Sequence, residues 1–432
     1  MEERNRNMPE EQDLSREQPG YARRMPRSGW EDGRRENGSR GRSGGIRGLF
    51  IIFALGMAAG IVVLLAAAQI LPVPISARQS FFSPGSGASA GGSAVNDDSI
   101  EKLRVLEQCI NEYYYAPEEV TVEGLETGMY KGIMDSLGDP YTVYYTEEEY
   151  KDLTEDTSGV YKGIGAYIGL DSTNNVPTFT GIMPGTPAEK AGLKVGDIIC
   201  EVDGTDTLSM STAEVAKRVK GEEGTQVEIK VQRDGEYMTF TVTRATINVP
   251  TVSSEMRDNG VGYLQISQFD DVTPNQFNEN LAQLKKDGMK SLIIDLRDNP
   301  GGTVSAVTQI ASELLPQGLI FYMEDKNGKR EEYKCPGADF NYPLVVLVNE
   351  YSASASEILA GAIQDAGIGT LVGTQTYGKG IVQNLYPLGD GSAIKITVAD
   401  YYTRAGRNIH KVGIEPDCVV ELDKEKYEEE NV

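Results

Sequence analysis

Histidine is nearly absent from this sequence of 432 residues, because His410 is its only copy. A metal centre built from several histidines is therefore excluded, and any Ser-His-Asp triad would have to use this one residue. His410 lies in a segment rich in glycine and arginine, which is typical of a surface loop. We expect no catalytic role for it, and a Ser-His hydrolase that uses His410 stays as the alternative.

Cysteine is also scarce. The four cysteines are widely spaced and form no CxxC pair, so the sequence predicts no zinc site and no bound metal or cofactor. Nothing in the sequence pairs them, and buried free thiols are the favoured interpretation. One or two disulfides remain the alternative if the chain lies outside the cytoplasm. The cysteines are Cys109, Cys200, Cys335 and Cys418.

Basic residues are fewer than acidic ones. Against 65 aspartates and glutamates the chain has 41 lysines and arginines, a formal net charge of −24. No net positive field would gather phosphate groups, which argues against a general nucleic-acid binder. The length allows two or three domains with a sizeable core.

The amino-terminal part predicts a membrane anchor. Residues 1–47 are polar and arginine-rich, which predicts a disordered cytoplasmic tail, and residues 48–71 form an uncharged apolar run. Twenty-four residues suffice to span a bilayer as a helix, and the arginines before the run place the remainder of the chain outside the cytoplasm. Residues 72–97, rich in glycine and serine, predict a flexible stalk. A signal peptide cleaved near residue 78 is the alternative.

Residues 98–157 predict a helical region. Two segments, 100–114 and 122–137, carry apolar residues at helical spacing. We expect the apolar face to belong to a core, with a homodimer surface as the alternative.

Residues 158–246 change to short strands separated by glycine turns. Asp203-Gly204 suggests a hairpin, residues 212–219 a helix, and residues 227–232 and 237–243 a last pair of strands. The order and the phrasing of this segment resemble a PDZ domain. The resemblance implies that backbone N–H groups of a glycine loop bind the terminal carboxylate of a peptide, while two helical side chains line its side-chain pocket. The residues concerned are Gly163, Ile164 and Gly165 in the loop, with Val215 and Val219 on the helix. The alternative is that these glycines only permit tight turns.

Residues 247–432 alternate apolar strands with helical patterns. Strands are predicted at 291–295, 344–348 and 393–400, with helices from about 304 to 315 and from Glu357 onward. Such alternation implies neighbouring parallel strands joined by crossover helices, hence an α/β core.

A run of small residues, Ser352 to Ser356, follows the strand at 344–348. A serine at a strand-to-helix junction has its hydroxyl near free N–H groups, which favour developing negative charge. Lys379, with a glycine on each side, follows 25 residues after Ser354. Serines also cap helices, and these residues alone do not choose between capping and catalysis, nor among the three serines.

Four phrases together resemble the carboxy-terminal (tail-specific) processing serine proteases with an inserted PDZ domain. The similarity runs from about residue 98 to 422, and the phrases are Asp295–Gly302, Ser352–Glu357, Tyr377–Gly380 with Gln383, and Ile409–Asp417. The resemblance implies a mixed fold: an α/β protease core of the ClpP/crotonase-like type and a mainly β PDZ domain, beside the helical region and one transmembrane helix.

The same resemblance implies a serine–lysine dyad. Ser354 would be the nucleophile, Lys379 the general base and Gln383 the residue that orients the lysine. A lysine accepts a proton near neutral pH only if burial lowers its pKa, and the apolar neighbours of Lys379 favour burial. N–H groups of Ala355 and of Gly301-Gly302 would stabilise the oxyanion. Ser356 would cap the helix.

Protein or peptide substrates with exposed C-termini are the implied partners, and the PDZ domain is expected to gate the active site. A non-catalytic PDZ scaffold on a protease-like fold is the alternative from another class.

Overall fold

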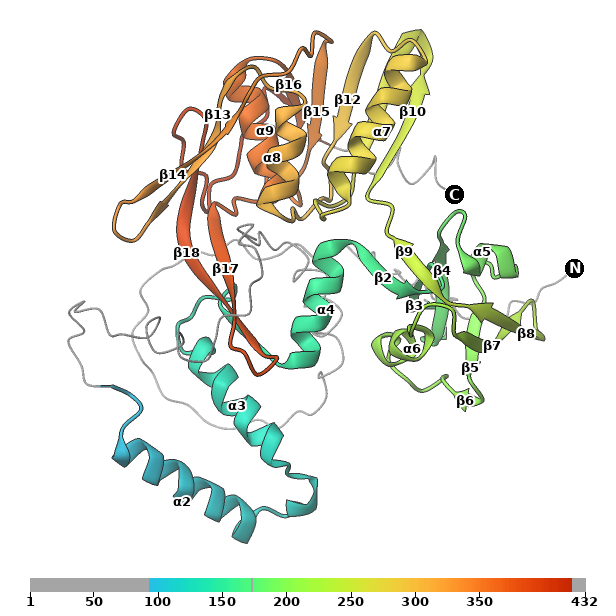
Figure 1. Ribbon diagram of the computed structural model, residues 1–432, viewed down its shortest axis with the longest axis vertical. Coiled ribbons are helices and arrows are strands. Elements are labelled where there is room, and N and C mark those ends of the chain that lie inside the picture. Colours follow the sequence, from blue (N-terminus) through green and yellow to red (C-terminus); the bar gives the residue numbers. More distant parts are fainter. Residues whose placement is uncertain (1–92, 172–173, 422–432) are drawn as a thin grey trace, which may run out of the picture. The chain divides into compact units, whose positions relative to one another are not determined.

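The computed structural model describes residues 93–171 and 174–421, and Figure 1 labels their helices and strands. The predicted tail, the predicted transmembrane helix and most of the stalk lie outside these described residues. Within the two described ranges, none of the helices combines the length and the hydropathy that a bilayer crossing requires.

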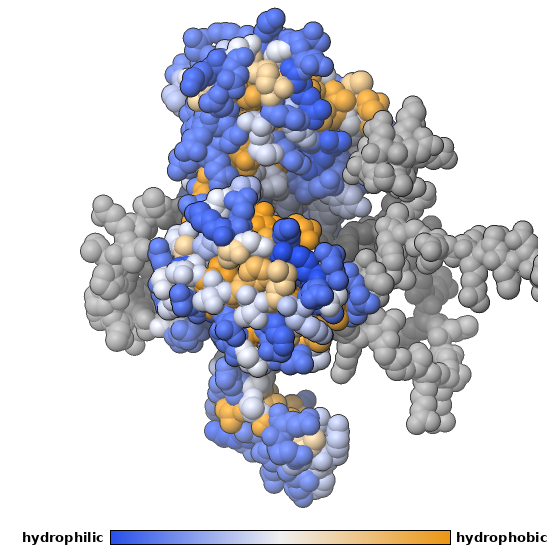
Figure 2. Space-filling view, turned by 90° about the vertical axis from the view of Figure 1, so that its right-hand side faces the viewer, coloured by the Kyte–Doolittle hydropathy of each residue, from blue (hydrophilic) through white to orange (hydrophobic). Residues whose placement is uncertain are grey.

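Two helices open the described chain, as predicted. Helix α2 (Asp97–Tyr113) begins at a capping box on Asn96, and α3 (Val122–Asp135) begins at Thr121, whose hydroxyl accepts the Gly124 N–H. Neither helix buries a residue. In Figure 2, apolar residues (orange) are visible on the surface in the lower part of the molecule, the level at which Figure 1 draws these helices. The expectation that their apolar face belongs to a core is therefore wrong, since α2 leaves several apolar side chains exposed: Ile100, Leu103, Val105 and Leu106.

Strand β1 (Val143–Tyr145) and helix α4 (Glu147–Ser158) lead into a two-stranded ribbon. The ribbon pairs β2 (Val160–Gly163) antiparallel with β9 (Ala245–Asn248). The chain leaves through β2 and returns through β9, so residues 164–244 form an insertion.

The insertion folds as an antiparallel sheet with two helices and its own buried apolar cluster. The predicted helix and the predicted last pair of strands are confirmed to within one residue at each end. In sheet order the strands are β3 (Ala166–Leu170), β4 (Pro177–Ile182), β5 (Ile198–Val202), β7 (Gln226–Arg233) and β8 (Glu236–Thr243), with β6 (Thr205–Asp206) on β5 and helices α5 (Pro187–Ala191) and α6 (Thr212–Val219).

The remainder is built on a six-stranded sheet, parallel except between its first two strands, which confirms the predicted alternation. Three helices lie side by side along it in Figure 1: α7 (Thr273–Lys286), α8 (Val304–Ser312) and α9 (Ala355–Ala366). In order, the strands are β10 (Val252–Arg257), β11 (Val261–Ile266), β12 (Ser291–Asp295), β15 (Leu344–Val348), β16 (Thr370–Gly373) and β19 (Cys418–Val419).

A second sheet packs on the other side of α9, which contacts both β16 of the first sheet and β13 and β18 of the second. Its long strand β18 (Ala393–Thr403) pairs with β17 (Ile381–Pro387) along one edge, and with β1 and then β13 (Gly318–Asp325) along the other. Strand β14 (Arg330–Cys335) completes it. The turn before α9 and the loop before β17 therefore come together at one side of the helix.

All four cysteines fall within the described residues, and each is a free thiol. Cys200 and Cys335 are buried, whereas Cys109 and Cys418 are exposed. The prediction of buried thiols therefore holds for two of the four.

Candidate active site

Ser354 occupies a strained turn between β15 and α9. It is the N-cap residue of α9, and its backbone has φ 55° and ψ −112°, a conformation that residues with a Cβ rarely adopt. The side chain is fully buried, yet its Oγ atom has no hydrogen-bond partner among the described residues. Strain of this kind persists only where the surrounding structure enforces it, and it concentrates at functional sites.

The neighbouring serines are committed to other bonds. Ser352 Oγ donates to the Leu296 carbonyl at 2.7 Å, and Ser356 Oγ donates to the Asn299 carbonyl at 3.0 Å. The prediction that Ser356 caps α9 is wrong, because its hydroxyl ties the turn to the segment after β12. Of the three serines, only Ser354 keeps its hydroxyl available for chemistry.

Gly301 and Gly302, which follow β12, differ in the hydrogen bonding of their N–H groups. Gly301 donates its N–H to Asn299 Oδ1 at 2.8 Å, whereas the N–H groups of Gly302 and Ala355 have no recorded bond to another described residue. A Cβ on Gly301 would stand 2.9 Å from both the Ala355 nitrogen and the Ser354 Cβ. Glycine is thus required for the close approach to Ser354, and Gly302 and Ala355 offer the open donors.

Lys379 is buried, as predicted, with 4% of its surface exposed. Burial lowers the pKa of its amine to about 8, although the charges of Glu357 and Asp139 act in the opposite direction. Its Nζ atom lies 4.5 Å from the centroid of the Tyr141 ring.

The glycines beside Lys379 have a packing role. A Cβ on Gly378 would stand 2.9 Å from the Val412 nitrogen, and one on Gly380 would stand 2.6 Å from the His410 nitrogen. The loop that carries His410 therefore packs directly on the backbone around the lysine.

Gln383 lies on β17 and is 1% exposed. Its Nε2 donates to Thr397 Oγ1 at 3.2 Å, while its Oε1 is buried without a hydrogen-bond partner among the described residues. This oxygen is a natural acceptor for an ammonium group. The predicted nucleophile needs a hydroxyl without a partner, and Ser354 Oγ meets this need. The residue predicted to orient the lysine needs an acceptor without a partner, and Gln383 Oε1 meets it.

Glu357 is the residue that the sequence reasoning missed. This fully buried carboxylate accepts four hydrogen bonds, from Thr376 Oγ1 at 2.6 Å, Gly378 N–H at 2.7 Å, and the N–H groups of Ser354 and Lys379 at 2.9 Å each. One carboxylate therefore fixes the backbone of Ser354, the candidate nucleophile, and the backbone of Lys379, the candidate base. The S-x-x-E spacing of a capping box was the available sequence signal.

We expect Glu357→Gln to lower kcat/KM about 100-fold. Burial raises the pKa of Glu357, while its four donors favour the charged form. A glutamine has nearly the same shape, but its NH₂ group would point at N–H donors where an oxygen now accepts. The measurement is kcat/KM beside thermal melting. The exposed Glu350→Gln is the matched control, and wild-type kcat/KM in the Glu357→Gln protein would contradict this role.

The predicted peptide-binding residues lie together in the inserted domain. Gly165 has φ 82°, and a Cβ there would stand 2.4 Å from the Thr186 Cβ. Ile164 packs in the buried cluster with Val215 and Val219 of α6, which are 0% and 4% exposed. Gly163 ends β2. The structure thus brings the loop and the helix together, and peptide binding stays a prediction.

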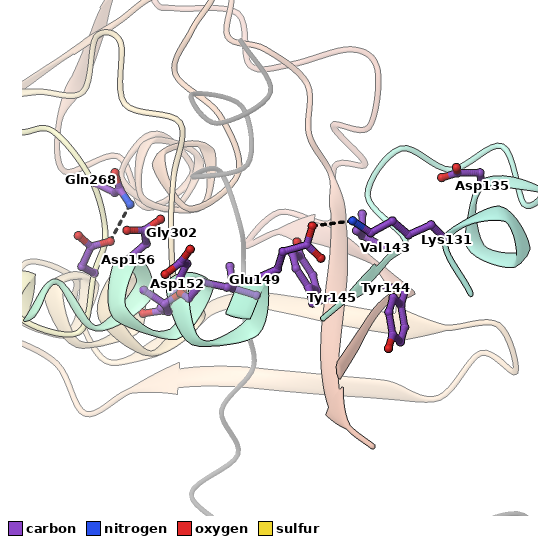
Figure 3. Close-up of a pocket in the computed structure, with 14 residues that line it drawn as sticks. Lys131, Asp135, Val143, Tyr144, Tyr145, Glu149, Asp152, Asp156, Gln268 and Gly302 are labelled. Atoms are coloured by element: carbon purple, nitrogen blue, oxygen red, sulfur yellow. Dashed lines mark hydrogen bonds and ion pairs between the residues drawn. The ribbon is translucent and has the colours of Figure 1, made fainter. Parts of the chain in front are cut away.

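A cavity of about 330 Å³ adjoins Gly302 (Figure 3). Its wall includes Asp152 and Asp156 of α4 together with Asp270, and burial raises the pKa of Asp270 to about 7. The Gly302 N–H group, one of the two candidate oxyanion donors, therefore borders this cavity. Within the described ranges, no three His, Cys, Asp or Glu side chains are grouped to hold a metal ion.

Comparisons with known proteins identify both folded parts of the chain. Residues 260–420 match the model of peptidase family S41, and residues 178–233 match that of a PDZ domain. The carboxyl-terminal-processing protease of Synechocystis sp. is 40% identical over 296 residues, covering 67% of this chain and 69% of that protein. The carboxy-terminal processing protease CtpA of Bacillus subtilis is 34% identical over 354 residues, covering 81% and 75%.

Among solved structures, the photosystem II D1 C-terminal processing protease is 29% identical with a TM-score of 0.44, covering 74% of this chain and 92% of that one. The sequence matches and the α/β core with its PDZ domain define a serine-type peptidase. The chain belongs to peptidase family S41.

Proposed function

We propose that this chain is a membrane-anchored endopeptidase that processes protein substrates recognised partly by their C-terminal residues. The observation that carries the catalytic part is the Glu357 carboxylate, which holds the backbone of Ser354 and that of Lys379 together. The relatives in Synechocystis and Bacillus subtilis, which are named for carboxyl-terminal processing, support the substrate class, as does the PDZ domain.

The proposed chemistry gives each of these groups one role. As Ser354 Oγ forms a bond to the scissile carbonyl carbon, its proton passes to Lys379 Nζ, which then gives it to the leaving amine. The Ala355 and Gly302 N–H groups stabilise the oxyanion, and Gln383 Oε1 orients the lysine. Water then attacks the acyl-enzyme, with Lys379 again as the base.

The location is proposed from the sequence. The apolar run at 48–71 with its preceding arginines supports a single-pass anchor in a bacterial cell membrane, with the catalytic part outside the cytoplasm. The exposed apolar side chains of α2 support a homodimer contact there.

A substrate comparison tests the proposed recognition. The full chain, purified in detergent, is given two peptides that differ only in a free carboxylate or an amide at the C-terminus. We expect the amide to lower kcat/KM at least about tenfold, since the PDZ loop would bind the carboxylate and this binding is proposed to gate the active site. Mass spectrometry of the fragments locates the cut. Equal kcat/KM values for the two peptides would rule out carboxylate recognition.

A further inference from the structure

The cavity beside Gly302 has no part in the proposed chemistry. Its volume of about 330 Å³ is at the lower end of the range for small-ligand sites and is enough for one long side chain. The one amine in its wall, Lys131, is paired with Glu149 at 2.6 Å, and Figure 3 draws it at the opposite end of the cavity from Gly302. Carboxylates outnumber this amine in the wall: Asp135, Glu149, Asp152, Asp156 and Asp270.

Asp270 is the buried carboxylate of this wall, with 4% of its surface exposed. Its Oδ1 accepts from Gln268 Nε2 at 2.8 Å, whereas its Oδ2 has no hydrogen bond to another described residue. Within the described ranges, no N–H group of α7 donates to this carboxylate and no lysine or arginine forms an ion pair with it. A buried carboxylate that lacks both a cation and a full set of donors is costly, so its open oxygen points to a ligand of positive charge.

The backbone before Asp270 is bonded to the segment that carries the candidate oxyanion donor. Phe269 donates its N–H to the Gly301 carbonyl at 2.8 Å, and Thr303 donates its N–H to the Phe269 carbonyl at 2.7 Å. A Cβ on Gly302 would stand 2.2 Å from the Phe269 oxygen, so the two segments are in contact. The carbonyl that the Gly302 N–H would bind belongs to the substrate residue before the cleaved bond. The side chain of that residue starts one atom away from this carbonyl, so the adjoining cavity lies within its reach.

We propose that the cavity binds the side chain of the substrate residue just before the cleaved bond, and that Asp270 selects a lysine or arginine at this position. The inference rests on the proposed endopeptidase function. Val143 and Leu153 supply apolar wall for the stem of such a residue, and the charged head would pair with Asp270. Asp156 adds negative charge at the same end of the cavity (Figure 3).

The protonation of Asp270 is consistent with a missing counter-charge. Burial raises the pKa of this carboxyl to about 7, and the carboxylates of Asp156 and Asp271 act in the same direction. A cation bound beside Asp270 would lower the pKa again and restore the charged form. An uncharged substrate side chain gives no such compensation.

Peptides that differ in one residue test the proposal. The full chain, purified in detergent, is given substrates with lysine, norleucine or glutamate before the cut, which mass spectrometry locates. Norleucine has the stem of lysine without its charge. We expect kcat/KM for the lysine peptide to exceed that for norleucine at least about tenfold, with the glutamate peptide lowest. In Asp270→Asn, the ratio of the lysine value to the norleucine value should fall at least about tenfold. Asp258→Asn, at an exposed aspartate between β10 and β11, is the matched control and should keep the wild-type ratio.

The ratio separates charge recognition from damage to the fold, because a structural defect lowers both values together. Equal kcat/KM values for lysine and norleucine in the wild type, or an undiminished ratio in Asp270→Asn, would overturn the inference and leave the endopeptidase function intact. If Asp270→Asn does not fold, Asp156→Asn on α4 should lower the same ratio about threefold, and an unchanged ratio in that variant would likewise overturn it. Cleavage of none of the three peptides would refute the proposed endopeptidase function and the inference with it.

Discussion

Ser354→Ala should lower kcat/KM by a factor of about 10⁴ or more, because the attacking oxygen is lost while the N–H donors stay. The residual activity would come from the oxyanion donors and from substrate binding alone. The fold should be unchanged, since Ser354 Oγ makes no hydrogen bond within the described residues that alanine would break. The measurement is peptide cleavage followed by mass spectrometry, with thermal melting to confirm folding.

The neighbouring serines provide matched controls. Ser356→Ala loses one hydrogen bond, to the Asn299 carbonyl, and should cost about 1 kcal/mol of stability. Ser352→Ala loses its bond to the Leu296 carbonyl and also the bond that it accepts from the Asn349 N–H, so it should cost about 2 kcal/mol. Both variants should retain most of the activity. Ser354→Gly should be as inactive as Ser354→Ala but more stable by about 1–2 kcal/mol, because glycine adopts φ 55° without strain. Processing that survives Ser354→Ala would remove this residue as the nucleophile.

Local patterns predicted the elements that surround the site. The strand at 344–348 and the helix at 212–219 match the structure residue for residue, because their apolar spacing and their bounding residues are strong local signals. The same signals located Ser354 at a strand-to-helix junction, and the family resemblance then chose it among three serines. Its strained backbone could not be predicted, since the strain is imposed by Gly301 and Asn299 packing from a distant loop.

The prediction failed where a side chain's role depends on a partner far along the chain. Glu357 was read only as the start of a helix, because its partners Thr376 and Gly378 lie about 20 residues away. Ser356 was assigned to the helix end, although a carbonyl 57 residues earlier accepts its hydroxyl. Strands β13, β14 and β17 were not predicted, although β13 contains an apolar run at residues 319–323.

Lys395 shows how alternation can mislead. In the strand at 393–400, isoleucines at 394 and 396 flank the lysine, and alternation of apolar and polar residues favours a buried isoleucine face with the lysine in water. The structure has the opposite arrangement: Lys395 is buried, while both isoleucines are only partly so. The buried amine is satisfied by Tyr145 of the neighbouring strand β1, whose hydroxyl accepts from Lys395 Nζ at 2.7 Å.

Lys379→Met should lower kcat/KM about 10³-fold or more and should also abolish its characteristic pH dependence. Methionine keeps the unbranched length of the side chain but has no basic atom. Because the pKa of Lys379 is lowered to about 8, the wild-type lysine is mostly protonated below that pH, and kcat/KM should fall tenfold for each unit below about 8. The methionine variant should show no such fall, which is the acidic limb of the kcat/KM profile. Covalent labelling of its Ser354 by a fluorophosphonate should be slow at every pH.

His410→Ala is the discriminating control for this prediction. The His410 atoms that lie against Gly380 are its nitrogen, Cα and Cβ, which alanine keeps, so the packing of this loop on Gly380 should be retained. Burial lowers the pKa of His410 below its usual value of 6.5, so a histidine base would place the acidic limb below pH 6.5, well under the limb expected from Lys379. A limb near pH 8 that survives His410→Ala and disappears in Lys379→Met assigns the base to the lysine. Activity that survives Lys379→Met but not His410→Ala would instead establish a Ser-His hydrolase on this fold.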